Sequence, residues 1–196
     1  MNNTGFTQFY ECLERSPVIA GLNNEALIEE CKKSSCEIAY ILFGDICNIA
    51  DIVDSVIEAG KIPIVHIDLI NGLSSREICV DFIHKYTRAA GIISTKPHLI
   101  KRGNELDMIT IQRFFMLDRM NYHNIKKQIK DTSPDIVEVM PAGLTKMIEY
   151  VMEEINGRPL IASGLIVDMS YVTGALSAGA VAVSTTNTDV WKALDR

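Results

Sequence analysis

The sequence lacks any apolar run of the ~18–20 residues that a helix needs to cross a bilayer, which excludes an ordinary helical membrane protein. The opening stretch, MNNTGFTQFYECLER, is polar and mixed in charge, so it does not resemble a secretory signal peptide. Cysteine is scarce: the chain has five, at positions 12, 31, 36, 47 and 79, and none forms a CxxC pair. This pattern is typical of reduced thiols rather than of a disulfide scaffold or a zinc site. We therefore expect a cytoplasmic protein without membrane contact.

Positive charge is also in short supply, with 19 lysines and arginines against 25 aspartates and glutamates and a net charge of −6. This balance argues against broad electrostatic capture of nucleic acid. Two short basic stretches are present, Lys96–Arg102 and the group of Lys126, Lys127 and Lys130. Neither is accompanied by the aromatic signature of an RRM or the GxxG clamp of a KH domain. We interpret both as solvated helix faces, so the residues by themselves do not indicate RNA binding.

What the chain does contain is a repeated alternation of a short apolar run and an amphipathic stretch. The expected strands are Val18–Ala20, Ile38–Phe43, Ile62–Ile67, Gly91–Ser94, Met108–Gln112, Ile136–Met140, Leu160–Ser163 and Ala180–Ser184. The expected helices are Asn24–Lys33, Ile49–Ala59, Ser75–Thr87, Pro97–Gly103, Tyr122–Lys130, Leu144–Ile155, Asp168–Ala178 and Asp189–Leu194. Continuous apolar runs are typical of parallel strands covered on both faces, and this many strand–helix pairs favour a closed barrel.

We therefore predict an α/β fold, a small TIM-like (β/α)₈ barrel in which residues 1–196 form one domain. Residues 1–16 are expected to form an N-terminal arm or helix that closes the N-terminal end of the barrel. Local sequence signals suggest helix caps: Ser74 with Glu77 as a capping box, and Asp118 and Asp168 as single N-caps.

Two apolar runs near the end of the chain, Leu160–Ser163 and Ala180–Ser184, each lead into small polar or glycine residues. Such tails let backbone N–H groups approach an oxyanion, and the positive end of a following helix would add to the attraction. Two successive units of this kind suggest the phosphate site that follows the last two strands of an α/β barrel. Ordinary loop chemistry is the alternative. The candidate residues are Gly164, Ser184 and Thr185.

Ionisable residues gather at the carboxyl ends of the predicted strands, where an α/β barrel has its working face. They are Asp45, His66, Asp68, Lys96, Arg113 and Glu138. Glu138 lies within the apolar segment IVEVM, where an ionised carboxylate needs a partner, and Lys96 and Arg113 are the candidates. Cations, backbone amides and carboxylates together suit a small polyol phosphate, whose hydroxyl groups would donate to the carboxylates.

Other interpretations of the same residues stay open at this point. The charges would also make a structural network across the top of a narrow barrel, and Asp45, Asp68 and Glu138 would also suit a hard cation such as Mg²⁺. His66 is either a general base beside Asp68 or a core imidazole. Lys96 would serve as a Schiff-base lysine only if its amine were desolvated and neutral.

The chain contains the sequence blocks LFGDICNIADIVD, AGKIPIVHIDLINGLSSRE, GIISTK, TIQRFFMLD, PDIVEVMPAG, PLIASGLI and AGAVAVSTTN. Together these blocks closely resemble the glycerol uptake operon antiterminator family. The resemblance runs from about Pro17 to Trp191, and the HIDL-x-x-GLSS and GIISTK blocks are its most specific parts.

The resemblance implies a TIM-barrel-like regulatory protein of glycerol metabolism that responds to glycerol 3-phosphate and binds leader mRNA to prevent early transcription termination. The protein would need no cofactor beyond this effector and would not be an enzyme; the alternative is a small phospho-sugar aldolase or isomerase. The ligand-binding residues carried over from the matching blocks are Asp45, His66, Asp68, Lys96, Arg113, Glu138, Gly164, Ser184 and Thr185. The RNA-binding surface, the RNA element and the number of subunits, including a homo-oligomer, stay open.

Overall fold

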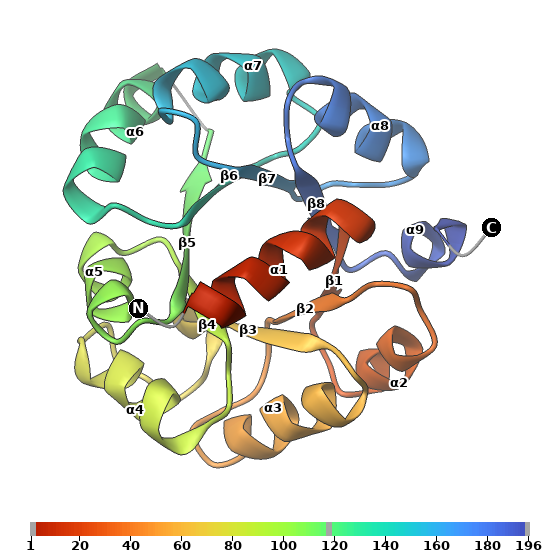
Figure 1. The fold of residues 1–196 in the computed structure, drawn as a ribbon, viewed down its shortest axis with the longest axis vertical. Helices are drawn as coiled ribbons and strands as arrows, with labels where there is room; N and C mark the ends of the chain where they lie inside the picture. Colours follow the sequence, from red (N-terminus) through yellow and green to blue (C-terminus); the bar gives the residue numbers. More distant parts are fainter. Residues whose placement is uncertain (1–2, 117–118, 195–196) are drawn as a thin grey trace.

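The computed structural model describes residues 3–116 and 119–194, which form a closed barrel of parallel strands surrounded by helices (Figure 1). The strands are β1 (Val18–Leu22), β2 (Ile38–Ile41), β3 (Ile62–His66), β4 (Gly91–Ser94), β5 (Ile109–Phe115), β6 (Ile136–Met140), β7 (Leu160–Ser163) and β8 (Ala182–Thr185). They pair in sequence order, and β8 closes the ring against β1. The predicted (β/α)₈ barrel is confirmed.

A helix follows each strand and returns the chain to the opposite end of the barrel, as parallel pairing requires. These helices are α2 (Ala26–Lys32), α3 (Ile49–Glu58), α4 (Ile78–Tyr86), α5 (Pro97–Glu105), α6 (Arg119–Thr132), α7 (Thr145–Glu154), α8 (Met169–Ser177) and α9 (Thr188–Ala193). A short 3₁₀ turn, η1 (Ile67–Leu69), comes directly after β3. Among the described residues, no helix combines the length and the apolar character needed to span a bilayer.

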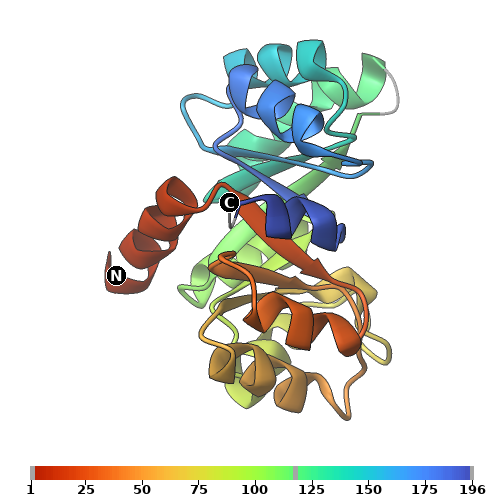
Figure 2. The same cartoon turned by 90° about the vertical axis from the view of Figure 1, so that its right-hand side faces the viewer.

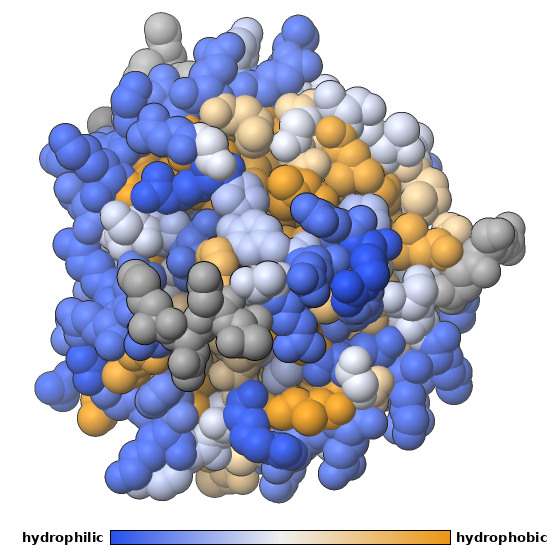
Figure 3. Space-filling view, in the orientation of Figure 1, coloured by the Kyte–Doolittle hydropathy of each residue, from blue (hydrophilic) through white to orange (hydrophobic). Residues whose placement is uncertain are grey.

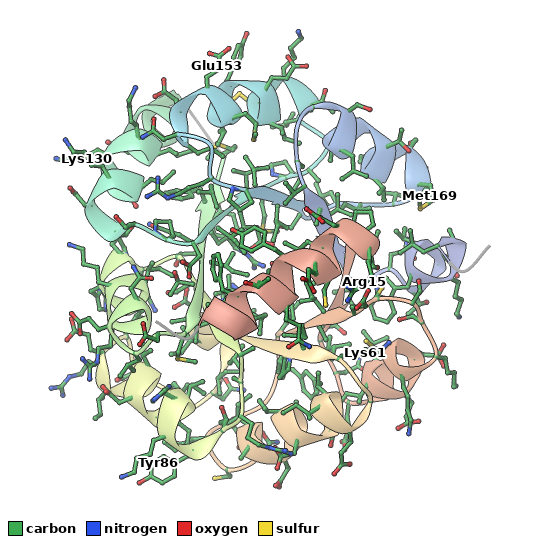
Figure 4. All side chains as sticks on the ribbon, in the orientation of Figure 1. Arg15, Lys61, Tyr86, Lys130, Glu153 and Met169 are labelled. Atoms are coloured by element: carbon green, nitrogen blue, oxygen red, sulfur yellow. The ribbon has the colours of Figure 1, made fainter. Side chains whose placement is uncertain are left out.

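The strands are apolar throughout because both of their faces are buried. Side chains that point outward pack under the helices, whereas those that point inward fill the barrel with a separate cluster built mainly from isoleucines and Tyr40. Figure 4 shows side chains filling this interior, while Tyr86, Lys130 and Glu153 point away from the helix ring. Strand alternation therefore decides which residues reach the centre of the barrel.

The helix α1 (Asn3–Arg15) lies across the N-terminal end of the barrel (Figures 1 and 2). Phe9, Cys12 and Leu13 are buried against the inner cluster. Arg15 anchors the end of the helix, because its Nε donates to Glu37 Oε1 at 2.9 Å. Polar and charged side chains dominate the periphery of this face of the molecule (Figure 3). Since α1 covers this end, the opposite, carboxyl end is the accessible one.

The predicted helix caps have mixed outcomes. Asp168 caps α8 by accepting from the Ser170 N–H at 2.8 Å, as predicted, while Asp118 lies outside the described residues. The capping box of Ser74 and Glu77 is wrong, because α4 starts only after Glu77 and no side chain caps it. The Ser74 N–H instead donates to Cys79 Sγ at 3.2 Å. Residues 70–77 form a loop between η1 and α4, at the carboxyl end of the barrel.

Candidate functional site

A cavity of about 410 Å³ opens at the carboxyl end of the barrel. Its lining residues come from the neighbouring strands β5 to β8, β1 and β2 and from the segments that follow them. Its size is within the range of small-molecule sites. The lining residues are Gly21, Leu42, Arg113, Met140, Ser163, Gly164, Leu165, Ile166, Val167, Ser184, Thr185 and Thr186. Four predicted ligand-binding residues are among them: Arg113, Gly164, Ser184 and Thr185.

Strand alternation explains why polar groups reach the base of this cavity. The odd-numbered strands each place one fully buried isoleucine in the inner cluster, namely Ile19, Ile64, Ile111 and Ile161. The residue two positions further along each strand points inward as well and forms the next layer, which consists of Gly21, His66, Arg113 and Ser163. A polar layer with one open, glycine position therefore lies directly above a layer of isoleucine.

Arg113 and Glu138 form the charged centre of this region. They are direct neighbours in the pairing of β5 and β6, and Arg113 Nε donates to Glu138 Oε2 at 2.6 Å. Ser184 Oγ donates to the other carboxylate oxygen of Glu138 at 3.1 Å. Burial by itself lowers the pKa of Arg113, but the charge and hydrogen bond of Glu138 outweigh it and raise this pKa. The partner of Glu138 that the sequence left open is therefore Arg113 rather than Lys96.

His66 lies in the same polar layer and is almost fully buried. Its Nδ1 has no hydrogen-bond partner among the described residues. Burial, reinforced by the positive charge of Arg113, lowers the pKa of His66 to about 4. The imidazole is therefore neutral at pH 7, and its Nδ1 can donate or accept a hydrogen bond according to its tautomer.

This shifted pKa predicts a stability loss in mild acid. The pKa of His66 falls from 6.5 in the unfolded chain to about 4 in the fold, so the unfolded state binds more protons between these values. The free energy of unfolding should therefore fall by up to ~3 kcal/mol as the pH drops through that window. Urea denaturation at pH 7 and pH 4.5 should show this drop, and His66→Asn should reduce it.

The control is His84→Gln, which replaces an exposed histidine of α4 rather than a buried one. Carboxylates with lowered pKa values, such as Asp68, lose their contribution over a lower pH range that overlaps the acid end of this window, so the difference between His66→Asn and the natural protein isolates the histidine. An NMR titration that places the folded-state pKa of His66 near 6.5 would contradict the prediction.

The predicted residues Asp68 and Lys96 belong to a separate network beside the cavity and do not line it. Asp68 Oδ2 accepts from the Thr95 N–H at 2.8 Å, and Ser94 Oγ donates to Asp68 Oδ1 at 3.0 Å. Lys96 Nζ lies 3.3 Å from Asp68 Oδ1 and donates to Ser75 Oγ at 2.6 Å, which ties down the 70–77 loop. Burial raises the pKa of Asp68, but these hydrogen bonds and the charge of Lys96 outweigh it and lower the pKa.

Asp45 has a local structural role and also lies outside the cavity lining. Its Oδ1 accepts from the Cys47 N–H at 2.8 Å, and its carbonyl oxygen accepts from the Ile49 N–H at 2.9 Å, so it shapes the start of α3. Asp45, Asp68 and Glu138 thus engage different partners. Within residues 3–116 and 119–194, no group of three or more His, Cys, Asp or Glu side chains converges.

The two segments predicted to hold phosphate do face the cavity. After β7 the chain turns sharply, with φ of +77° at Gly164 and +56° at Leu165. After β8, Asn187 Nδ2 donates to the Val167 carbonyl at 2.7 Å and so joins the two segments. Asp168 and Asn187 each accept one N–H at the start of α8 and α9, those of Ser170 and Asp189. The segments between these strands and helices contribute residues to the cavity lining, and the contribution of the helix N-termini stays a prediction.

Several residues of this region were not predicted from the sequence. Tyr40 points into the barrel from β2, and its hydroxyl is fully buried without a hydrogen-bond partner among the described residues. Ser163, Gly21 and Thr186 line the cavity. The inward direction of Gly21 and Ser163 could have been predicted, because each lies two residues after an inward-pointing isoleucine on the same strand.

Comparisons with known proteins agree on one family. The sequence profile of the glycerol-3-phosphate responsive antiterminators matches residues 18–191. An uncharacterized Escherichia coli (strain K12) protein, YgcP, is 39% identical over 179 residues, which cover 91% of this chain and 93% of YgcP.

Solved structures give the same result. The glycerol uptake operon antiterminator regulatory protein from Listeria monocytogenes superposes with a TM-score of 0.86 at 27% identity, over 89% of this chain and 94% of its own. A related protein from Thermotoga maritima MSB8 gives 0.81 at 29% identity, over 90% and 98%. Aldolases at 11% and 13% identity are similar in fold alone.

Proposed function

Because the chain belongs to the glycerol-3-phosphate responsive antiterminator family, we propose that it binds glycerol 3-phosphate at the carboxyl end of its barrel and in response acts on leader mRNA to prevent transcription termination. The observation that supports this proposal most strongly is the convergence of Arg113 with the segments after β7 and β8 on one cavity. A buried cation and backbone N–H groups are the partners that a phosphate ester requires.

In the proposed complex, the phosphate lies beside Gly164–Leu165 and Thr185–Thr186, and Arg113 supplies positive charge. A guanidinium carries five N–H donors, so Arg113 can serve Glu138 and a ligand oxygen at the same time. Ser184 completes the polar wall, since it already donates to Glu138. Asp68 and Lys96 then act indirectly, by fixing the 70–77 loop beside the ligand.

Receptor rather than enzyme function is supported by the chemistry of the interior. The structure describes all eight strands, and none of them contains a lysine. Arg113 is the cationic residue of the strands, and its guanidinium cannot lose a proton to become a nucleophile. Lys96, the Schiff-base candidate of the sequence, is held by Asp68 and Ser75. Glu138 is engaged by Arg113 and Ser184, which makes it a poor general base.

Regulation requires that glycerol 3-phosphate bind two states of the protein with different affinities. The segments proposed to move are Asn71–Ser74 and Ala142–Leu144, which adjoin the carboxyl end of the barrel. The first is linked to the ligand region through Ser75 and Lys96, and the second through the Ala142 N–H, which donates to the Ser163 carbonyl at 2.7 Å. Ser163 lines the cavity, so a shift there would reach the loop directly.

The proposal is tested by calorimetric titration with glycerol 3-phosphate, followed by fluorescence anisotropy with labelled leader mRNA in the presence and absence of the ligand. Micromolar to millimolar binding of the phosphate and a ligand-dependent RNA affinity are expected. A coupling of about 5- to 150-fold is typical of allosteric proteins. No binding heat and no thermal shift at millimolar glycerol 3-phosphate would rule out the effector site. Identical RNA affinity in both conditions would rule out the regulatory step and leave the effector site intact.

A further inference from the structure

Three buried polar atoms in the upper part of the barrel have no hydrogen-bond partner among the described residues: Tyr40 Oη, His66 Nδ1 and Ser163 Oγ. Their residues are only 0%, 3% and 2% exposed. Buried polar groups in folded proteins are nearly always paired, because an unpaired group loses its hydration without compensation. A concentration of such groups in one region therefore indicates that another molecule completes their hydrogen bonds.

The three groups belong to the same region of the barrel as Arg113 and Glu138. His66 and Ser163 occupy the polar layer that contains Arg113, and Ser163 also lines the cavity. Tyr40 points into the barrel from β2, and its neighbour two residues on, Leu42, lines the same cavity. Tyr40 and His66 do not themselves line the cavity, but the charges of Arg113 and Glu138 act on both, so both lie close to this charged pair.

We propose that Tyr40, His66 and Ser163 form a hydroxyl-binding subsite at the base of the cavity, which selects phosphate esters with a neutral polyol tail. The inference rests on the proposed function, since it assumes that a phosphate ester enters the cavity. Tyrosine and serine hydroxyls and a neutral imidazole can each donate or accept, and so can an alcohol, so the two sets are chemically matched. A plain alkyl tail would leave all three groups unpaired.

The charged pair beside the subsite adds a second level of selection. Glu138 is fully buried, and its charge is balanced by the single guanidinium of Arg113. A ligand with a carboxylate tail would bring a further negative charge next to Glu138 in a buried site, where like charges repel strongly. The subsite therefore fits glycerol 3-phosphate better than a phosphorylated carboxylic acid of the same length.

The test is calorimetric titration of the whole protein with glycerol 3-phosphate and with n-propyl phosphate, which has the same carbon chain without hydroxyl groups. We expect glycerol 3-phosphate to bind at least ~30-fold more tightly, since two or more buried hydrogen bonds separate the ligands. Tyr40→Phe and Ser163→Ala should each reduce this selectivity ratio about 5- to 10-fold. The controls are Ser16→Ala and Tyr86→Phe. Ser16 carries another buried hydroxyl without a partner in the described part of the chain, but it lies at the N-terminal end, and Tyr86 is on the exposed surface.

Unfolding of the unliganded variants separates a binding role from a structural one. Because each substitution removes an unpaired buried hydroxyl, the urea midpoints of Tyr40→Phe and Ser163→Ala should be equal to or above that of the natural protein. Equal affinity for the two phosphate esters would overturn the subsite, and so would an unchanged selectivity ratio in both variants. In either case the effector site would stand, and water rather than the ligand would pair with the three buried groups. If neither glycerol 3-phosphate nor n-propyl phosphate bound, the effector site and the subsite would be overturned together.

Discussion

Replacing Arg113 with methionine is expected to lower the free energy of unfolding by about 3–5 kcal/mol, because the substitution leaves the carboxylate of Glu138 buried without its charged partner. Glu138 is 0% exposed, and its bond to Arg113 Nε is 2.6 Å long. Ser184 would be its remaining partner at 3.1 Å, and one neutral hydroxyl cannot compensate a buried charge. Urea denaturation followed by circular dichroism would measure the loss.

A double variant separates the cost of breaking the pair from the value of having it. Arg113→Met combined with Glu138→Leu removes both charges, so it should recover most of the lost stability and lie within about 2 kcal/mol of the natural protein. The double variant should nevertheless fail to bind glycerol 3-phosphate, since the proposed phosphate site has lost its cation. Stability and ligand binding would then vary independently at this position.

The matched control is the ion pair of Arg102 with Asp81, which joins α5 to α4 with an Nη2–Oδ1 distance of 2.5 Å. Both side chains are about one-third exposed, at 31% and 32%, so water screens the pair. Arg102→Met should therefore cost less than about 1 kcal/mol. If the Arg113 and Arg102 variants lost equal stability, the buried pair would not have the role assigned to it.

The architecture of the barrel could be predicted from the sequence because it depends on local patterns. Each continuous apolar run marked a strand whose two faces are buried, and the runs at 136–140 and 160–163 match β6 and β7 to the residue. The segments after β7 and β8 could be predicted for the same reason, since Gly164, Ser184 and Thr185 stand at strand ends. In a closed barrel, strand ends converge whatever the details of packing.

The partners of individual side chains could not be predicted, because they depend on register and on small differences in strand length. The choice between Lys96 and Arg113 as the partner of Glu138 was settled by the pairing of β5 with β6. β4 ends at Ser94, so Lys96 already belongs to the turn before α5 and reaches Asp68 instead. Tyr40 was not predicted because a tyrosine in an apolar run resembles a core residue, and only the packing shows that its hydroxyl has no partner within the residues that the structure describes.

Replacing Gly21 with leucine is expected to weaken glycerol 3-phosphate binding more than ~100-fold, because the new side chain would occupy the volume in which the ligand lies. Gly21 points inward from β1 and lines the cavity. A Cβ atom there would already lie 3.1 Å from Thr186 Cγ2 and 3.2 Å from the Thr185 carbonyl oxygen, beside the proposed phosphate site. The backbone of Gly21 is ordinary strand, so the substitution adds bulk without demanding a left-handed conformation.

Thermal or urea unfolding with and without ligand provides the measurement. At a ligand concentration of 100 times the dissociation constant, the natural protein should gain about 2.7 kcal/mol of stability, whereas Gly21→Leu should gain almost none. Gly174→Ala on α8 is the control, because its Cβ meets only Thr145 Cγ2 at an ordinary 3.4 Å, and it should respond to ligand as the natural protein does. If effector binding is what changes RNA affinity, Gly21→Leu should also bind leader mRNA equally with and without glycerol 3-phosphate. A variant that still gains the full stabilisation from glycerol 3-phosphate would place the effector outside this cavity, since a leucine and the ligand cannot share the same space.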